Sequence, residues 1–448
     1  MGDYRRVADT VAAEIEAGRL RPGDRLPTQR DFARRHGIAN STATRVYREL
    51  ARRGLTAGEV GRGTFVREPT GADAGPLLTE PARTRVDLEL NYPVVPEQAA
   101  LLGAGLGPLL RPDALAGALR PVGAAGTPAA RAAAAALLAR GGWHPDPGQV
   151  LFAGNGRQAI SAAVTALVPP GGRLGVEELT YPVLGAIAAR LGITLVPLAM
   201  DGDGVIPKAV AQAHRAGPLQ AIYVQPTVHN PLSLTMTDGR RAHLAEAVRR
   251  IGVPVIEDAV WSFLRDDVPP LAALVPERTL LVDSLSKRLA PGLTLGFAVV
   301  PPALAAPVSA ALRSGGCTPP RFALEAAILW QADGTVAELA RAKRRDAAVR
   351  QEIARRHLGD FAVRSDPRSY YCWWELPRPW RTDSFVAAAA RHGIGVAPAA
   401  AFSAGRGRGR TPDAIRLALA SPGTEVLGQA LETLAGLARS APEDLVTD

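Results

Sequence analysis

Three lysines are the first candidates for chemistry in this sequence, because arginine supplies nearly all of its other basic residues. Among 52 basic residues only Lys208, Lys287 and Lys343 are lysine. A lysine amine with a lowered pKa can deprotonate and form a Schiff base, whereas an arginine guanidinium stays protonated. Lys287 comes shortly after the apolar run 280–282, which is typical of a short buried strand. We therefore expect Lys287 to be the lysine that reacts with a carbonyl group.

Polar residues follow other strand-like runs as well. Asp258 comes directly after 253–257, Asn230 lies shortly after 221–224, and the glycine-rich turn 154–158 opens a helix. Ligands of open α/β sheets gather at the carboxyl ends of the strands, and the free N–H groups of such a turn suit a phosphate. A lysine, a carboxylate, an amide and a phosphate-binding turn are the set that pyridoxal phosphate requires, with the carboxylate keeping the pyridine nitrogen protonated.

The elements that must position these residues are short apolar runs that alternate with alanine-rich helical runs. This alternation predicts an α/β fold with a largely parallel sheet covered by helices. The alanine-rich run 129–139 is predicted to be a helix, and the aromatic run 370–374 a buried strand of a smaller domain. The strands expected for the main sheet are 150–153, 173–176, 193–198, 221–224, 253–257, 280–282 and 297–300.

Residues 1–68 have a different character. They hold fourteen arginines, no lysine and nine acidic residues, which gives them a net charge of +5. This is more than half of the net charge of +9 of the whole chain. Such a concentration of positive charge predicts binding to a polyanion, most simply nucleic acid. Helical patterns begin near Tyr4, after Thr28 and after Asn40 as N-cap, and a two-strand ribbon with a glycine-rich tip follows at 58–66. This order is that of a winged helix-turn-helix.

Residues 4–67 resemble the GntR family of bacterial regulators, through the run 21–30 and the tip 61–66. The resemblance implies that the third helix enters the major groove of DNA and that the wing contacts the minor groove or the backbone. Ser41 stands where the family often carries a base-reading arginine, so no operator sequence follows from the resemblance. The residues implied to face DNA are Arg30, Ser41, Thr42, Arg45, Arg48, Arg62 and Thr64.

The run 284–297, with the Asn230-Pro231 and Glu257-Asp258 segments, resembles the fold-type I aminotransferases. Joined to the GntR-like head, the whole chain resembles the MocR subfamily of regulators. The resemblance implies three parts: a winged helix-turn-helix domain of the α+β class at 1–68, a linker at 69–85, and a pyridoxal-phosphate-dependent transferase fold at 86–448, with a large domain at about 125–305 and a small C-terminal domain.

The resemblance also implies roles for individual residues. Lys287 would carry the cofactor as an internal aldimine, Asp258 would contact the ring nitrogen and Asn230 the ring hydroxyl, and Tyr181 would stack on the ring. Arg416 would bind the carboxylate of a substrate or effector as a bidentate partner. The phosphate would be held by Gly156, Arg157 and Ser284.

Three positions depart from the aminotransferase pattern. Val260 replaces a tyrosine that bonds to the ring hydroxyl, Thr294 replaces a phosphate-binding arginine, and Pro121 replaces a tyrosine that reaches the phosphate of the neighbouring subunit. Each lost contact is worth about 1–3 kcal/mol where charge is involved. We expect either a lowered affinity for pyridoxal phosphate or a rebuilt site in which Arg157 replaces the charge missing at Thr294.

These observations lead to the hypothesis of a transcriptional regulator that binds double-stranded operator DNA, forms a homodimer and senses an amino-acid or amine effector through Lys287, with slow or absent turnover. One alternative is an active aminotransferase that carries a DNA-binding head, and another is a regulator whose body has lost the cofactor. The run 284–287 also fits the Ser-x-x-Lys motif of penicillin-binding enzymes, but their other motifs do not follow.

The sequence also suggests a compartment. Cys317 and Cys372 are too few for a disulfide framework and lack metal-ligand spacing, so we expect a reducing compartment and no metal site. The first residues lack the apolar core of a signal peptide, and no run of about 18 apolar residues could span a membrane. We therefore expect a cytoplasmic, nucleoid-associated bacterial protein.

Overall fold

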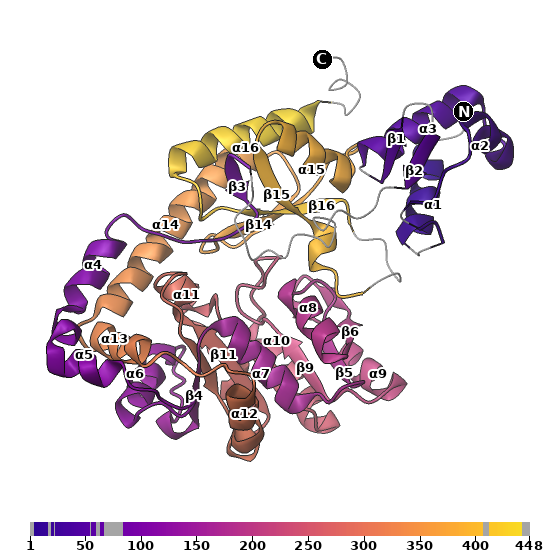
Figure 1. Cartoon of the computed structure of the whole chain (residues 1–448). Helices are drawn as coiled ribbons and strands as arrows, with labels where there is room; N and C mark the ends of the chain where they lie inside the picture. The colour runs from indigo at the N-terminus through magenta and orange to yellow at the C-terminus, as the bar shows by residue number, and fades with distance from the viewer. Residues whose placement is uncertain are drawn as a thin grey trace.

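The computed structural model describes residues 4–16, 19–21, 23–53, 55–59, 63–66, 84–405 and 412–440. Figure 1 shows a small N-terminal unit, here called the head, beside a larger body that contains two sheets. Within these ranges no helix combines the length and the apolar character that crossing a membrane requires. The predicted linker at 69–85 lies mostly outside the described residues, as does Arg62.

The head consists of α1 (Tyr4–Glu16), α2 (Gln29–His36) and α3 (Asn40–Arg52), followed by the antiparallel strands β1 (Thr56–Glu59) and β2 (Gly63–Val66). The predicted winged helix-turn-helix is therefore present. Its core is made by buried apolar side chains from the three helices, from β2 and from the segment before α2: Ala8, Val11, Leu26, Phe32, Ala33, Ala43, Val46, Tyr47, Leu50 and Val66.

The ends of α2 follow the predicted signals. Thr28 caps it, since its Oγ1 accepts from the N–H of Asp31, and Gly37 ends it with φ 63°, in the left-handed region that favours glycine. The start of α3 differs by one residue from the prediction. The N-cap is Ala39, which has an extended backbone conformation, and Asn40 is the first helical residue. Ala39 has no side-chain group that could cap the helix.

The main sheet of the body has seven strands in the order β4-β12-β11-β10-β9-β5-β6. All neighbouring pairs are parallel except those of β12, which runs antiparallel to β4 and β11. The predicted α/β class and all seven strands are confirmed, with ends shifted by up to two residues. The strands are β4 (Val150–Ala153), β5 (Arg173–Glu177), β6 (Thr194–Leu198), β9 (Ala221–Val224), β10 (Val255–Asp258), β11 (Thr279–Ser284) and β12 (Gly296–Val299).

Helices cover both faces of this sheet, because successive strand side chains point to opposite faces. Leu151 packs in one apolar cluster with α7 and α12, whereas Phe152 packs in another with α6 and α13. These helices and those at the far edge are α6 (Pro128–Leu138), α7 (Gly156–Leu167), α8 (Val183–Leu191), α9 (Pro207–Ala216), α10 (Asp238–Ile251), α12 (Pro302–Ser314) and α13 (Arg321–Ala332).

A second sheet of five strands has the order β13-β14-β16-β15-β3. Its edge strand β3 (Val86–Leu88) comes from the chain before the main sheet and pairs in parallel with β15. Residues 371–374 of the predicted aromatic run form the buried part of a strand here, which begins one residue later than predicted. The remaining elements are β13 (Val363–Ser365), β14 (Tyr371–Glu375), β15 (Ile394–Pro398) and β16 (Ala414–Ala418), with α14 (Thr335–Leu358), α15 (Thr382–Arg391) and α16 (Thr424–Arg439).

Shorter elements connect these layers. Two further helices precede the main sheet, a small hairpin follows β6, and a four-residue helix follows β11. They are α4 (Gln98–Gly105), α5 (Pro112–Ala118), β7 (Met200–Asp201), β8 (Gly204–Val205) and α11 (Leu285–Arg288), with single 3-10 turns at Gly107–Leu110, Pro147–Gln149, Ser262–Leu264, Leu271–Ala273 and Ala399–Phe402.

Ion pairs join the head to the second sheet of the body. Asp9 on α1 accepts from Arg53 of the head (2.9 Å) and from Arg381, the N-cap residue of α15 (2.8 Å). Arg381 also pairs with Asp413 (2.8 Å), which directly precedes β16. In Figure 1 the head accordingly lies beside α15.

Candidate functional site

A cavity of about 320 Å³ lies at the carboxyl ends of the central strands of the main sheet, where the second sheet and residues 89–92 face them. This is where ligands of open α/β sheets gather, since parallel strands end at one common edge. The eight residues for which the sequence suggested a cofactor or effector role all line it: Gly156, Arg157, Tyr181, Asn230, Asp258, Ser284, Lys287 and Arg416.

Lys287 lies in α11 (Leu285–Arg288), the short helix that follows β11. Its Nζ donates to the carbonyl oxygen of Asn91 at 2.6 Å. The same Nζ is 5.1 Å from the ring centroid of Tyr92 and 5.5 Å from that of Trp261, distances at which an ammonium is attracted to an aromatic face. The amine is thus held among aromatic groups at the edge of the cavity.

The environment of Lys287 favours the neutral amine. Burial, followed by the positive charges of Arg157 and Arg416, lowers the pKa of Lys287 from 10.5 to about 7. At neutral pH a large fraction of this amine is therefore deprotonated. A neutral lysine amine is a nucleophile and a base, which the ammonium is not.

Asp258 ends β10 and is buried. One carboxylate oxygen accepts from Gln225 Nε2 at 2.8 Å and from the hydroxyl of Tyr223, and the other accepts from the N–H of Val260 at 3.0 Å. Burial raises the pKa of Asp258, and these hydrogen bonds oppose that rise. No cationic side chain among the described residues pairs with Asp258, so a cation in the cavity would stabilise this carboxylate.

An anion-binding corner lies at the start of α7. The side chain of Asn155 caps the helix by accepting from the N–H of Gln158 (2.9 Å), and the first N–H groups of α7 have no partner within the helix. Gly156 lies close to Ser284, because a Cβ at Gly156 would be 3.2 Å from the Ser284 Oγ. The serine hydroxyl and the helix N-terminus therefore face the same point.

Arg157 brings a positive charge to this corner. Its Nε donates to the Tyr181 hydroxyl at 3.2 Å, and it has no acidic partner within the described ranges. Burial raises the pKa of Tyr181, so this hydroxyl remains protonated at neutral pH. Arg157 and the N-terminus of α7 together give this end of the cavity a positive potential.

Arg416 lies on β16, at the opposite end of the cavity, and is only 5% exposed. Its Nη1 donates to Asn230 Oδ1 at 3.2 Å and its Nη2 donates to the carbonyl oxygen of Glu89. The Nε has no hydrogen-bond partner among the described atoms. Burial lowers the pKa of Arg416 to about 10, which indicates a cation that would gain from a bound anion.

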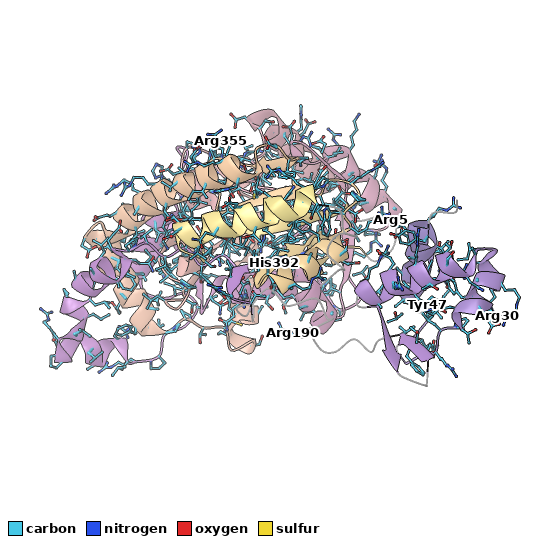
Figure 2. All side chains as sticks on the ribbon, turned by 90° about the horizontal axis from the view of Figure 1, so that it is seen from above. Arg5, Arg30, Tyr47, Arg190, Arg355 and His392 are labelled. Carbon is cyan, nitrogen blue, oxygen red and sulfur yellow. The ribbon has the colours of Figure 1, made fainter. Side chains whose placement is uncertain are left out.

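The second face of interest is on the head. Arg30, Ser41, Arg45 and Arg48 are exposed on α2 and α3, whereas Thr42 is half-buried. Figure 2 shows Arg30 on the side of the head that faces away from the body. Thr64 is half-buried on β2. The suggested DNA-facing residues that are described thus lie on the helices and wing of one small unit.

Comparison with known sequences agrees with this division. Residues 3–66 match the family described as "Bacterial regulatory proteins, gntR family". The chain is 28% identical over 436 residues to YdeF, an uncharacterized HTH-type transcriptional regulator of Bacillus subtilis. This match covers 96% of this chain and 93% of YdeF. The chain is also 28% identical over 391 residues to the probable rhizopine catabolism regulatory protein MocR of Rhizobium meliloti, covering 80% of this chain and 78% of that one.

Solved structures with a similar fold are aminotransferases. An archaeal alanine:glyoxylate aminotransferase has a TM-score of 0.73 at 21% identity and covers 88% of this chain and 99% of its own. A kynurenine aminotransferase of Pyrococcus horikoshii has a TM-score of 0.72 at 19% identity and covers 83% and 93%. The body therefore has the fold-type I aminotransferase fold, joined to a GntR-family head. The chain has the MocR-type architecture.

Two of the three positions at which this MocR-type chain departs from the aminotransferase pattern line the cavity. Val260 and Thr294 both face it, whereas Pro121 is not among its lining residues. Val260 cannot offer a side-chain hydroxyl, and its N–H is used by Asp258. Thr294 carries no charge, so within the described residues Arg157 is the cationic side chain that lines the phosphate-compatible end.

Several residues that shape the MocR-type cavity were not assigned a role from the sequence. Tyr223 and Gln225 hold Asp258, and Asn91 and Tyr92 contact Lys287. Gln225 directly follows a predicted strand, so its position was a usable signal. Asn91 and Tyr92 lie in a segment about two hundred residues before Lys287, and no local pattern connects them.

Proposed function

We propose that this protein is a pyridoxal-phosphate-dependent transcriptional regulator, in which the head binds operator DNA and the body senses an amino-acid or amine effector at Lys287. The observation that carries the proposal is the convergence of Lys287, Asp258 and Arg416 on one cavity in a chain whose head is a GntR-family domain. A cavity of this kind in the body gives the DNA-binding unit a place to receive a chemical signal.

The residues that line the cavity suit pyridoxal phosphate. When bound, this cofactor supplies an aldehyde that reacts with a primary amine and a pyridine ring that withdraws electrons. Lys287 offers a buried amine with a pKa of about 7, and Asp258 offers a carboxylate that lacks a cationic partner among the described residues. Asn230 would contact the ring hydroxyl, and Tyr181 would lie against the ring.

The phosphate would bind at the N-terminus of α7. Gly156 allows the helix start to approach Ser284 closely, and Arg157 supplies the positive charge that Thr294 lacks. A phosphate held by helix N–H groups and one guanidinium forms charge-assisted hydrogen bonds. We therefore assign the charge-bearing role to Arg157 in this chain.

Arg416 would bind a carboxylate of the effector. Its unpartnered Nε and its deep burial leave one buried donor without an acceptor, and a carboxylate would satisfy it. The effector class that follows is an amino acid, or another amine that bears an acid group. Its binding near β16 offers a physical route to the head, because Asp413 directly precedes β16 and pairs with Arg381.

The partners in this proposal are double-stranded operator DNA and a second copy of the chain. Leu110 and Leu119, which flank α5 and are 60% and 73% exposed, support a homodimer, because exposed apolar residues favour contact with another chain. A regulator that contacts operators would act in the bacterial cytosol, at the nucleoid. Turnover would be slow or absent, and a change in operator binding would be the output.

The absorbance spectrum of purified holo protein tests the cofactor assignment. We expect a visible band, and after borohydride reduction a pyridoxyl mass on the peptide that contains Lys287. The variant Lys287→Ala should lose both signals completely, whereas the exposed lysine variant Lys208→Ala should keep them. A label on another lysine would contradict the assignment, and a colourless protein that still binds its operator would favour a regulator that has lost the cofactor.

One observation favours an active aminotransferase as a second candidate. The lowered pKa of Lys287 makes its amine suitable as a base as well as an attachment point. Stopped-flow spectra with a panel of amino acids and keto acids separate the two functions. Repeated turnover at about 1 per second or faster, an ordinary enzymatic rate, would establish the enzyme.

A further inference from the structure

Lys343 is a fully buried charged residue close to the cavity, although it does not line it. It lies on α14 and its side chain is 0% exposed. Its Nζ donates to the carbonyl oxygen of Lys287 at 3.0 Å and to the carbonyl oxygen of Leu289. Both acceptors lie at the carboxyl-terminal end of α11, the helix that carries Lys287. Lys343 therefore binds the backbone of the reactive lysine without lining the cavity itself.

The helix α11 needs such an external contact. It has only four residues, and the last carbonyl groups of a helix find no N–H donor within the helix. Without the Lys343 amine, the carbonyl groups of Lys287 and Leu289 would lose this donor, and leaving a buried carbonyl group unpaired costs free energy. An amine donor placed at this end also interacts favourably with the negative end of the helix.

Lys343 is held at a cost of its own. Burial, and then the charge of Lys287, lower the pKa of Lys343 to about 7, while Asp346 on the same helix acts in the opposite direction. The Asp346 carboxylate is also engaged by Arg350 and by the hydroxyl of Tyr370. Lys343 is thus a fully buried lysine in a chain that otherwise uses arginine, and its amine donates its hydrogen bonds to the backbone around Lys287.

We propose that Lys343 is a positioning residue that fixes Lys287 in the cavity, so that the reactivity of the Lys287 amine and the affinity for the cofactor both depend on Lys343. This inference adds a residue to the site of the proposed function, and its cofactor readout rests on that function. Its first readout does not, because the reactivity of Lys287 is a property of the protein alone.

The first experiment measures the pH dependence of Lys287 acylation in the full chain without cofactor, by competitive labelling with acetic anhydride and mass spectrometry. Arg157 and Arg416 are the charged groups that lower the pKa of the Lys287 amine, and the charge of Lys287 in turn lowers the pKa of Lys343, so the wild-type midpoint should lie near pH 7. In Lys343→Met, which keeps the apolar stem without the donor, we expect the midpoint to rise by about 1 pH unit as a buried like charge is lost. The exposed control Lys208→Met should keep the wild-type midpoint.

The second experiment measures the affinity of the full chain for pyridoxal phosphate by absorbance titration. Lys343→Met should weaken binding about tenfold, as expected for a loss of about 1.4 kcal/mol. Lys343→Gln retains two N–H donors without the charge, and it should recover most of the affinity while its acylation midpoint stays shifted. This variant also carries the test if Lys343→Met does not fold.

The outcomes are distinct. Either variant, Lys343→Met or Lys343→Gln, could lower the melting temperature while the acylation midpoint stays at the wild-type pH and the cofactor affinity stays within twofold of wild type. In that case Lys343 has only a structural role and the inference is wrong. If the wild type itself binds no pyridoxal phosphate, the proposed function fails, and the acylation midpoints alone decide the role of Lys343.

Discussion

The head and the cavity present their functional groups in opposite ways. In the head, Arg45 and Arg48 are exposed on one helix and close in sequence. In the cavity, Arg416 is buried on β16, and Lys287 is half-buried in the short helix that follows β11, a strand of the other sheet. Exposed donors on a helix need only a small folded unit to display them. Buried charges need the complete body, because each one depends on partners far away in the chain.

The comparison explains why the electrostatics of the two regions differ. Water solvates the exposed arginines of α3, so their charges serve long-range attraction to DNA phosphates. Burial lowers the pKa of Lys287 to about 7 and that of Arg416 to about 10, so these groups are prepared for a specific ligand. One region thus depends on charge at the surface, and the other on charge removed from water.

Removing one buried leucine from each region should separate their functions most strongly. Leu50 and Leu434 are both 0% exposed, in the cores of the head and of the second sheet. Leu50→Ala and Leu434→Ala should each cost about 2–5 kcal/mol of stability. Since the head is small, Leu50→Ala should abolish operator binding while the visible spectrum remains. Leu434→Ala should abolish the visible spectrum while operator binding remains. Fluorescence anisotropy and absorbance on the same samples measure both. Loss of both signals in Leu50→Ala would show that the regions do not fold separately.

The carboxylate-binding role of Arg416 predicts the next largest effect. Arg416→Ala should weaken the binding of amino acids by about 1.5–3 kcal/mol, since it removes a buried charged donor. Amines of the same length without a carboxylate should bind the variant and the wild type equally. Calorimetric titration with matched pairs of amino acids and amines measures the difference. The exposed Arg439, which pairs with Asp360, provides a control in Arg439→Ala. Equal losses for acids and amines would contradict a carboxylate contact.

The exposed arginines of α3 predict a different kind of loss. Arg45→Ala and Arg48→Ala should each weaken operator binding by about 1–3 kcal/mol if the side chain reads a base. A purely phosphate-contacting arginine should instead reduce the slope of affinity against salt by about 1. Binding isotherms at several salt concentrations distinguish these cases. Arg355→Ala on α14, whose side chain is 72% exposed, is the control. Wild-type affinity and salt slope in both α3 variants would show that this face does not bind DNA.

The smallest effect should come from the ion pair between the two regions. Asp9 and Arg381 are 2.8 Å apart, with side chains 35% and 23% exposed, so solvent screens their attraction. A double-mutant cycle with Asp9→Asn and Arg381→Gln should give a coupling free energy of about 0.2–1 kcal/mol in thermal unfolding. Arg391→Gln, an exposed position on the same helix, should show no coupling to Asp9→Asn. Equal coupling for Arg391 would mean that the measured effect is not the pair.

Much of the fold could be predicted because its signals are local. The three helices and the wing of the head follow from apolar spacing and caps, such as Thr28 and Gly37 around α2. The seven strands of the main sheet follow from short apolar runs between helical runs. The prediction was wrong by one residue at the start of α3, where Ala39 and not Asn40 caps the helix. Cap geometry depends on backbone angles that the residue type alone does not fix.

The sequence by itself determined which residues stand at the strand ends, and therefore that Lys287, Asp258 and Asn230 meet at one edge of a parallel sheet. Strand, turn and helix follow one another within a few residues, so neighbouring residues in the sequence determine their order. Only the tertiary structure decided that Asn91, 196 residues before Lys287, accepts from its amine, and that Lys343, 56 residues after it, holds its backbone. Such contacts arise when separately folded elements pack together, and the lowered pKa of Lys287 follows from that packing, because burial and not sequence neighbours is its largest cause.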